Sequence, residues 1–213
     1  MAIYNVVIQV FSTREKEPSA VVRMWQDQNT IPGEVWDIDY QLCRNNPEDA
    51  IMFTENVGDV TTINVSGGKL DARNQAHNKA YDQGYDIIVA AGADAKPRSQ
   101  NTLPALLHPF HSRQNVVAVD SNPVSDGLYG SFLNAVTSLE DSIRPHISRQ
   151  CSAFTAEAWD HAGPFDAGSV DQRDRAATRI EEERRFYKRL NRYGKVVKAH
   201  NAVVENQKRI FDY

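Results

Sequence analysis

The sequence predicts an α/β protein with one mainly parallel central sheet flanked by helices, and two observations support this class. Short runs of β-branched and aromatic residues alternate along the chain with longer segments of helical periodicity. The run 85–91 ends in five consecutive apolar residues, which is typical of a strand buried on both faces. Strands separated by helices indicate parallel pairing, because a parallel neighbour needs a long crossover connection. No internal repeat or linker divides the 213 residues, so we expect a single domain.

The individual elements follow from local patterns. Seven segments have the composition or the period of strands: 4–11, 34–42, 60–65, 85–91, 116–120, 151–154 and 196–204. Helical patterns begin at Pro18 and recur at 47–57, 69–83, 99–108, 131–142, 155–162 and 171–193. A glycine follows three of these helices, at Gly84, Gly163 and Gly194. The tryptophans stand within apolar patterns and are expected in the core: Trp25, Trp36 and Trp159.

Composition excludes several classes of protein. The chain is 41% apolar and has a mean hydropathy of -0.54, without an apolar run near the ~20 residues that a membrane helix needs. Its first residues lack the basic start and the cleavage site of a signal peptide, so we expect none. Cys43 and Cys151 are too few for a disulfide framework and predict reduced thiols. Together these features predict a cytoplasmic protein without a membrane span.

Charge is distributed unevenly along the chain. The net charge is -4, yet residues 172–213 contain 12 basic and 6 acidic side chains and therefore carry +6. Such a basic segment could bind phosphate or nucleic acid. We favour a solvated helix instead, because Glu181, Glu182 and Glu183 precede Arg184 and Arg185 at spacings that form ion pairs on a helix surface.

Polar and basic residues follow the predicted strands where these end. In an open parallel sheet, ligands bind beyond the carboxyl ends of the strands. The sequence places there the segments 12–15, 44–49, 66–69 and 92–97, with Arg73 one helical turn beyond the third. These side chains suit an anionic, hydrogen-bonding ligand such as a nucleotide.

The order of these segments resembles the nucleotide-binding half of family 2 glycosyltransferases, which have the Rossmann-like GT-A fold. In that family a Gly-x-x-x-x-Arg-Asn helix precedes a hydrophobic strand that ends in Asp-x-Asp. Residues 68–74 match the helix, and residues 85–97 match the strand and its turn. Residues 152–166 resemble the acceptor-side strand and the Gly-Gly-Phe-Asp turn, and Val170-Asp171 resembles the Glu-Asp pair before the closing helix. The resemblance covers nearly the whole chain.

The resemblance implies a metal-dependent, inverting glycosyltransferase that takes a sugar from a UDP- or GDP-sugar donor. Departure of the nucleoside diphosphate builds negative charge, which a divalent cation and fixed basic groups stabilise. Asp94 would bind Mn²⁺ or Mg²⁺, since these cations accept oxygen ligands, and His200 would add a late histidine ligand as in some GT-A enzymes. The other implied donor-site residues are Thr13, Arg14, Asn45, Lys69 and Arg73.

The acceptor side needs a carboxylate that removes a proton from the attacking hydroxyl. The resemblance assigns this role to Asp171, with Asp174 as the substitute, although Asp171 also suits the N-cap of the long helix. One position departs from the family, because Gly92 stands where the first acid of Asp-x-Asp is expected. A single carboxylate can suffice when substrate phosphates and water complete the coordination. Asp94 could alternatively cap the helix that is expected from Ser99.

The resemblance also divides the single domain, 1–213, into parts. Residues 1–97 would bind the nucleotide sugar, 98–171 would bind the acceptor, and 172–213 would form a C-terminal helix and an extended tail. The acceptor could be a glycan, a protein or a modified nucleic acid. The compact acceptor half is consistent with a bacterial or phage transferase, which in the latter case would act in the host cytoplasm.

Other readings remain open. Gly92 is compatible with a non-catalytic protein that binds sugar nucleotides or glycans. A nucleotidyltransferase is less consistent with the chain, because its first loop, 12–16, has no glycine. Overall acidity disfavours a nucleic-acid-binding module. His108 and His111 have a possible zinc-ligand spacing, but a helix interruption is expected between them, at Pro109. Stacking on a sugar is a further possible role for Trp159 or Tyr129.

Overall fold

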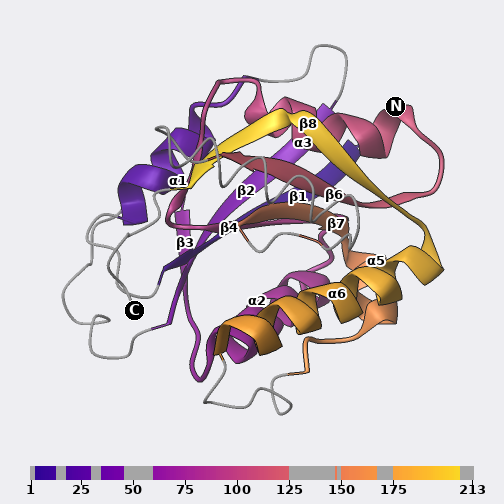
Figure 1. The fold of residues 1–213 in the computed structure, drawn as a ribbon. Helices are drawn as coiled ribbons and strands as arrows, with labels where there is room; N and C mark the ends of the chain where they lie inside the picture. The colour runs from indigo at the N-terminus through magenta and orange to yellow at the C-terminus, as the bar shows by residue number, and fades with distance from the viewer. Residues whose placement is uncertain are drawn as a thin grey trace.

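The computed structural model describes residues 3–12, 18–29, 35–45, 60–124, 147, 150–166 and 175–206. Its centre is one eight-stranded sheet in the order β3-β2-β1-β4-β7-β6-β8-β5 (Figure 1). The strands are β1 (Ile3–Ser12), β2 (Val35–Arg44), β3 (Val60–Asn64), β4 (Ile87–Gly92), β5 (Ala95–Pro97), β6 (Val116–Val124), β7 (Cys151–Thr155) and β8 (Lys195–Asn206).

Strand pairing confirms a mainly parallel sheet and shows where it is mixed. Strands β3, β2, β1 and β4 are parallel, and β6 is parallel to β8. Strand β7 runs antiparallel to both β4 and β6, and the short β5 is antiparallel to β8. The carboxyl ends of β1, β2, β3, β4 and β6 therefore point to the same edge of the sheet, where the sequence predicts the ligand site.

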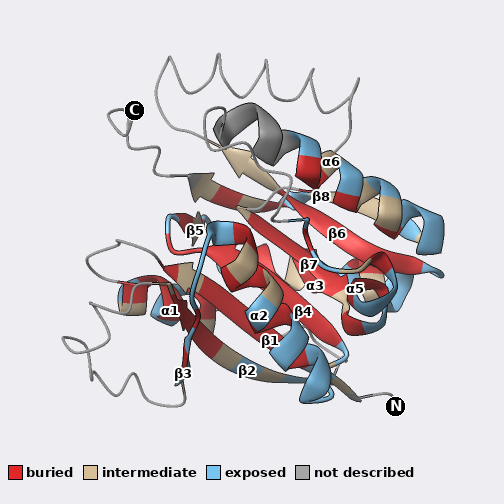
Figure 2. Ribbon diagram, turned by 90° about the horizontal axis from the view of Figure 1, so that it is seen from below, coloured by how far each residue is buried: buried red, intermediate tan, exposed pale blue. Residues whose placement is uncertain are grey.

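Helices cover both faces of this sheet. Helices α1 (Pro18–Gln26) and α3 (Thr102–Ser112) pack on one face, and α2 (Lys69–Asp82), α5 (Ala156–Ala162) and α6 (Arg175–Tyr193) pack on the other. Buried residues concentrate in the strands and on the sheet-facing sides of the helices (Figure 2). Among the described helices, none is long and apolar enough to span a bilayer.

Most predicted elements are present, with two differences. The sequence did not predict β5, whose three residues are too few to show a period. Helix α3 begins at Thr102 instead of residue 99 and continues through Pro109 to Ser112, so the expected interruption is wrong. Pro109 is itself buried, and Leu106 of the same helix packs into the core, and this burial offsets the hydrogen bond that a proline cannot donate. The helices predicted at 47–57 and 131–142 lie outside the described residues.

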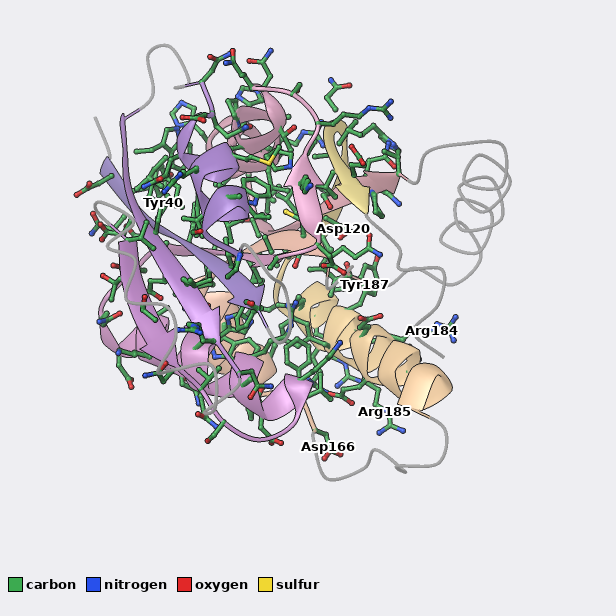
Figure 3. The ribbon with its side chains drawn as sticks, turned by 90° about the vertical axis from the view of Figure 1, so that its left-hand side faces the viewer. Tyr40, Asp120, Asp166, Arg184, Arg185 and Tyr187 are labelled. Atoms are coloured by element: carbon green, nitrogen blue, oxygen red, sulfur yellow. The ribbon has the colours of Figure 1, made fainter. Side chains whose placement is uncertain are left out.

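Helix α6 is less solvated than its charges predict. Glu182 and Glu183 are buried, with 1% and 6% of their surfaces exposed. Glu182 accepts a hydrogen bond of 3.1 Å from Arg189 Nη2 and one of 2.9 Å from the backbone N–H of Asp166. Arg185 and Asp166 lie at the outer edge of this layer (Figure 3). The helix therefore uses one of its carboxylates to hold the chain after α5, a tertiary role that i,i+4 spacing cannot reveal.

A buried polar network lies between helix α2 and strands β1 and β2. Gln9 Nε2 donates to Gln41 Oε1 (2.9 Å) and to the Ala76 carbonyl (2.8 Å), which leaves Gln9 Oε1 as the acceptor for His77 Nδ1 at 2.7 Å. His77 Nδ1 therefore carries the proton, and its Nε2 has no hydrogen-bond partner among the residues that the structure describes. The imidazole is surrounded by rings, including that of Phe154 at 5.1 Å. Burial, with a smaller contribution from the charge of Arg73, lowers the pKa of His77 well below its ordinary 6.5.

We expect His77 to make the fold sensitive to acid. Below pH 6.5 the unfolded chain takes up a proton at this histidine and the folded protein does not, so the free energy of unfolding falls as the pH falls. Between pH 7.5 and 5.5 this loss amounts to about 1.4 kcal/mol. Urea unfolding at both pH values measures it. His77→Phe should remove this part of the pH dependence, whereas His161→Gln, at an exposed histidine, should keep it. An unchanged pH dependence in His77→Phe would contradict the assignment.

Candidate functional site

The polar edge that the sequence predicts, called the rim below, is present at the carboxyl ends of the central strands. The backbone N–H of Asn45, after β2, donates to the carbonyl of Ser12 at the end of β1 (3.0 Å). The N–H of Ala93, after β4, donates to the carbonyl of Phe11 (2.9 Å), and that of Gly92 donates to the carbonyl of Gln150, before β7 (2.8 Å). These bonds bring the ends of four strands together. The predicted residues Asn45 and Asp94 therefore belong to one edge.

Helix α2 starts at the same rim. Its first residue, Lys69, is exposed, and the carboxylate of Asp71 accepts a hydrogen bond of 3.1 Å from the N–H of Gly68. This bond satisfies one of the backbone donors at the helix start, where the helix dipole also favours a negative charge. Lys69 consequently has a fixed backbone and a solvent-facing side chain, which suits contact with a phosphate.

Arg73 lies one turn further along α2 and is buried, with 8% of its surface exposed. Its guanidinium carbon lies 4.6 Å from the centre of the Phe11 ring, a cation–π distance. Burial lowers the pKa of Arg73 to about 10, against the opposing effects of Asp94, Cys43 and Cys151. The side chain therefore remains charged at neutral pH and forms part of the floor beneath the rim.

Two buried thiols lie near this cation. Cys43 and Cys151 are both free, as the sequence predicts. Burial raises the pKa of Cys43 to about 12 and also raises that of Cys151, although the charge of Arg73 opposes both shifts. Both thiols are therefore protonated and unsuited to act as nucleophiles or metal ligands at neutral pH.

Asp94 is exposed in the turn between β4 and β5. A single exposed carboxylate fits a divalent cation that takes its other ligands from phosphate oxygens and water. His200, on β8, is also exposed. In the described part of the chain, no three His, Cys, Asp or Glu residues are grouped so that they could hold a metal ion. The assignment of Asp94 and His200 as metal ligands thus stays a prediction.

The other predicted site residues divide into two groups. Thr13, Arg14, Asp171 and Asp174 lie outside the described residues, as does Tyr129. Trp159 is 2% exposed and is packed among aromatic rings, so it belongs to the core and does not line a sugar pocket. The exposed histidines His108 and His111 belong to no metal-ligand group in the part of the chain that the structure describes.

Two rim residues were given no role from the sequence, although Arg44 belongs to the segment 44–49 that was expected at this edge. Arg44 is 7% exposed and lies at the end of β2, beside Ser12 of β1. A buried cation at the end of a strand is a candidate for anion binding or for support of the rim. Gln150 is half-buried, and its carbonyl fixes the start of the Asp94 turn. The available signal for Arg44 was its position directly after the apolar part of a strand, but burial of an arginine is decided only by the tertiary structure.

The residue after Arg73 has a structural role. Asn74 Nδ2 donates to the carbonyl of Phe165, and Asn74 Oδ1 accepts from the N–H of Phe165, both at 2.9 Å. The two residues of the Arg-Asn pair in the Gly-x-x-x-x-Arg-Asn helix thus have different roles. Arg73 turns toward the rim, and Asn74 holds the Gly163–Asp166 turn, which precedes the segment that contains Asp171.

We expect Asn74→Ala to lower the free energy of unfolding by about 1–3 kcal/mol, because both backbone groups of Phe165 lose their partner in a half-buried position. Gln75→Ala is a matched control. Gln75 makes the same pair of bonds to the backbone of Ser66, but both residues are exposed and water can replace the amide. Urea unfolding should give a clearly smaller loss for Gln75→Ala, and equal losses would contradict the bracing role of Asn74.

Comparison with solved structures decides the fold. A mannosyltransferase from Pyrobaculum calidifontis, in complex with GDP-Man and Mn²⁺, is similar with a TM-score of 0.63 and 16% identity over 97% of this chain and 58% of its own. Glucosyl-3-phosphoglycerate synthase from Mycobacterium tuberculosis, in complex with Mn²⁺, UDP-glucose and phosphoglyceric acid, is similar with a TM-score of 0.64 and 15% identity over 97% and 72% of the two chains. The chain has the GT-A fold.

The resemblance to GT-A glycosyltransferases is thereby confirmed at the level of the fold. A mycobacterial protein is also similar, with a TM-score of 0.65 and 15% identity over 98% of this chain and 69% of its own. No protein-family model and no curated protein matches the sequence. The GT-A chain described here spans a little over half the length of the mannosyltransferase.

Proposed function

We propose that this protein is a metal-dependent glycosyltransferase that uses a UDP- or GDP-sugar and, by its predicted carboxylate base, inverts the sugar's configuration. The observation that carries the proposal is the rim itself. It joins the exposed carboxylate of Asp94 to the start of helix α2 at the carboxyl ends of parallel strands, in a GT-A fold. Two similar structures hold Mn²⁺ together with a nucleotide sugar, which supports the same ligand class here.

The residues of the rim have distinct roles in this proposal. Asp94 would hold the cation, Mn²⁺ or Mg²⁺, which when bound neutralises charge on the departing diphosphate. Lys69 would contact the diphosphate from the first turn of α2, where backbone N–H groups and the helix dipole also favour an anion. Asn45, with Thr13 and Arg14, would hold the nucleoside. His200 would approach the same cation from β8.

On the acceptor side, Asp171 would accept the proton of the attacking hydroxyl, with Asp174 as the substitute. The described chain supports this placement indirectly. The Gly163–Asp166 turn, only a few residues before Asp171, is held by Asn74 on one side and by Glu182 on the other. Inversion requires that the hydroxyl activated by this base attacks the sugar carbon from the side opposite the leaving diphosphate. The acceptor could be a glycan, a protein or a modified nucleic acid.

Thermal unfolding with nucleotides tests the proposal. At a nucleotide concentration about 100 times the dissociation constant, UDP or GDP should raise the melting temperature by roughly 5–10 °C with Mn²⁺ present, and by clearly less in EDTA. Asp94→Ala should abolish the metal-dependent part of the shift. The absence of a metal-linked shift with every nucleoside diphosphate would count against the proposal. A panel of nucleotide sugars, scored by released UDP or GDP, then identifies the donor.

A second function is favoured by one observation, the glycine at position 92 where the family has an acid. A non-catalytic GT-A protein that binds a sugar nucleotide or a glycan would give the thermal shift without releasing nucleotide from any donor. Donor turnover by the wild-type protein separates the two functions, because only the enzyme catalyses it.

A further inference from the structure

The turn after β4 is shaped by the side chain of Asp94. A Cβ atom at position 92 would collide with Asp94 Oδ1 and lie 3.6 Å from its Cγ. Asp94 therefore folds back over Gly92 and occupies the space in which a side chain at position 92 would stand. The missing first acid of the Asp-x-Asp pattern and the conformation of the second acid are thus one structural feature.

Arg73 lies beside this turn from the helix side. Phe11, whose ring contacts the guanidinium, is the register neighbour of Gly92, and its carbonyl accepts the hydrogen bond of Ala93. Paired residues of neighbouring strands direct their side chains to the same face of a sheet, so Arg73 over Phe11 and Asp94 over Gly92 both lie on the α2 side of this pair. Because Arg73 is 8% exposed, its guanidinium offers little surface to a nucleotide, whereas the neighbouring Lys69 is exposed.

We propose that Arg73 is a positioning residue for Asp94, and that Gly92 is required because Asp94 is held folded back over it. The site would then be built for one carboxylate, and adding an acid at position 92 would displace Asp94 instead of restoring a second ligand. This inference rests on the proposed function for its meaning in catalysis. The coupling between Arg73 and Asp94 can be tested without any ligand.

The first experiment measures the coupling between the two residues without ligand. Melting temperatures of wild type, Arg73→Met, Asp94→Asn and the double variant form a double-mutant cycle. Positioning of Asp94 by Arg73 predicts that the losses are non-additive by roughly 2–4 °C. Additive losses would overturn the proposal. Lys79→Met, which removes an exposed charge from the same helix, should combine additively with Asp94→Asn.

The second experiment measures the affinity for UDP and GDP by calorimetry, with Mn²⁺ and with EDTA. Arg73→Met and Gly92→Ala should weaken the Mn²⁺-dependent affinity by about 10- to 100-fold and leave the affinity in EDTA unchanged. Arg73→Lys should keep more of the Mn²⁺ dependence than Arg73→Met, because it keeps the charge.

The outcomes separate this inference from the proposed function. Weaker binding of Arg73→Met in EDTA would show that Arg73 contacts the nucleotide, and this would overturn the positioning role. Unchanged Mn²⁺-dependent affinity in Gly92→Ala would overturn the role of Gly92. A wild-type protein that binds neither nucleotide, but shows the non-additive melting temperatures, would overturn the proposed function and support the pairing of Arg73 with Asp94.

Discussion

Replacing Asp94 by asparagine is expected to lower the turnover of a nucleotide sugar by about 10²–10³-fold, the cost of losing one electrostatic stabiliser of the developing charge. Asparagine keeps the size and one oxygen of the side chain but removes the charge that would bind the cation. Release of UDP or GDP from the best donor measures the effect, at saturating donor and at a Mn²⁺ concentration that saturates the wild-type protein. Higher Mn²⁺ concentrations should restore part of the lost turnover, because the cation still finds oxygen ligands on the diphosphate.

Asp82→Asn is the matched control for this substitution. Asp82 is an exposed carboxylate at the last residue of α2, at the other end of the helix from the rim. Its neutralisation changes the net charge by the same amount and should leave turnover within about twofold, because charges on the surface are screened over such distances. A comparable loss in both variants would assign the effect of Asp94→Asn to net charge and contradict a local role.

Trp159→Ala is expected to cause the largest loss of stability, about 3–5 kcal/mol in the free energy of unfolding. The indole is 2% exposed, and its centre lies 5.5 Å from the rings of both Phe165 and Phe186. Its Nε1 donates to Asn78 Oδ1 at 2.9 Å, so truncation also leaves that acceptor without its partner. Urea unfolding at pH 7.5 measures the loss.

Trp36→Ala provides the comparison at the same residue type. The sequence predicts Trp36 in the core, but the structure shows it half-buried on β2, stacked on Tyr4 with 5.0 Å between ring centres. We expect its truncation to cost less than about 2 kcal/mol, since part of its surface is already in water. If both truncations cost the same, the aromatic cluster around Trp159 would not be the main core of this face.

The sequence predicted the strands and helices wherever the pattern was local and long. Alternation in β2, the apolar run of β4 and the glycine after α2 needed no tertiary information, and Gly84 has the expected positive φ of 80°. Local patterns failed where packing outweighs propensity. Helix α3 passes through Pro109 because its apolar side is buried, and α6 buries Glu182 because the chain after α5 needs an acceptor.

The sequence predicted where the candidate site lies, but not how its side chains are arranged. Position after a strand placed Asn45 and Asp94 on one edge, because parallel strands end together. It could not tell that Arg73 contacts Phe11 while Asn74 holds Phe165, since both depend on how α2 packs against β1 and against the chain after α5. It also could not explain Gly92, whose neighbour Asp94 fills the space of a side chain.

The sequence by itself determined the α/β class, the order of the elements and the edge at which polar residues collect, because these depend on period and on chain order. Only the tertiary structure decided which charges are buried and which glycines are required by close approach. Gly194 follows α6 as the pattern predicts, yet its reason is tertiary, because a Cβ there would collide with Val117 and lie 2.9 Å from the carbonyl oxygen of Asn115. Such contacts join residues far apart in the chain, and no local pattern contains them.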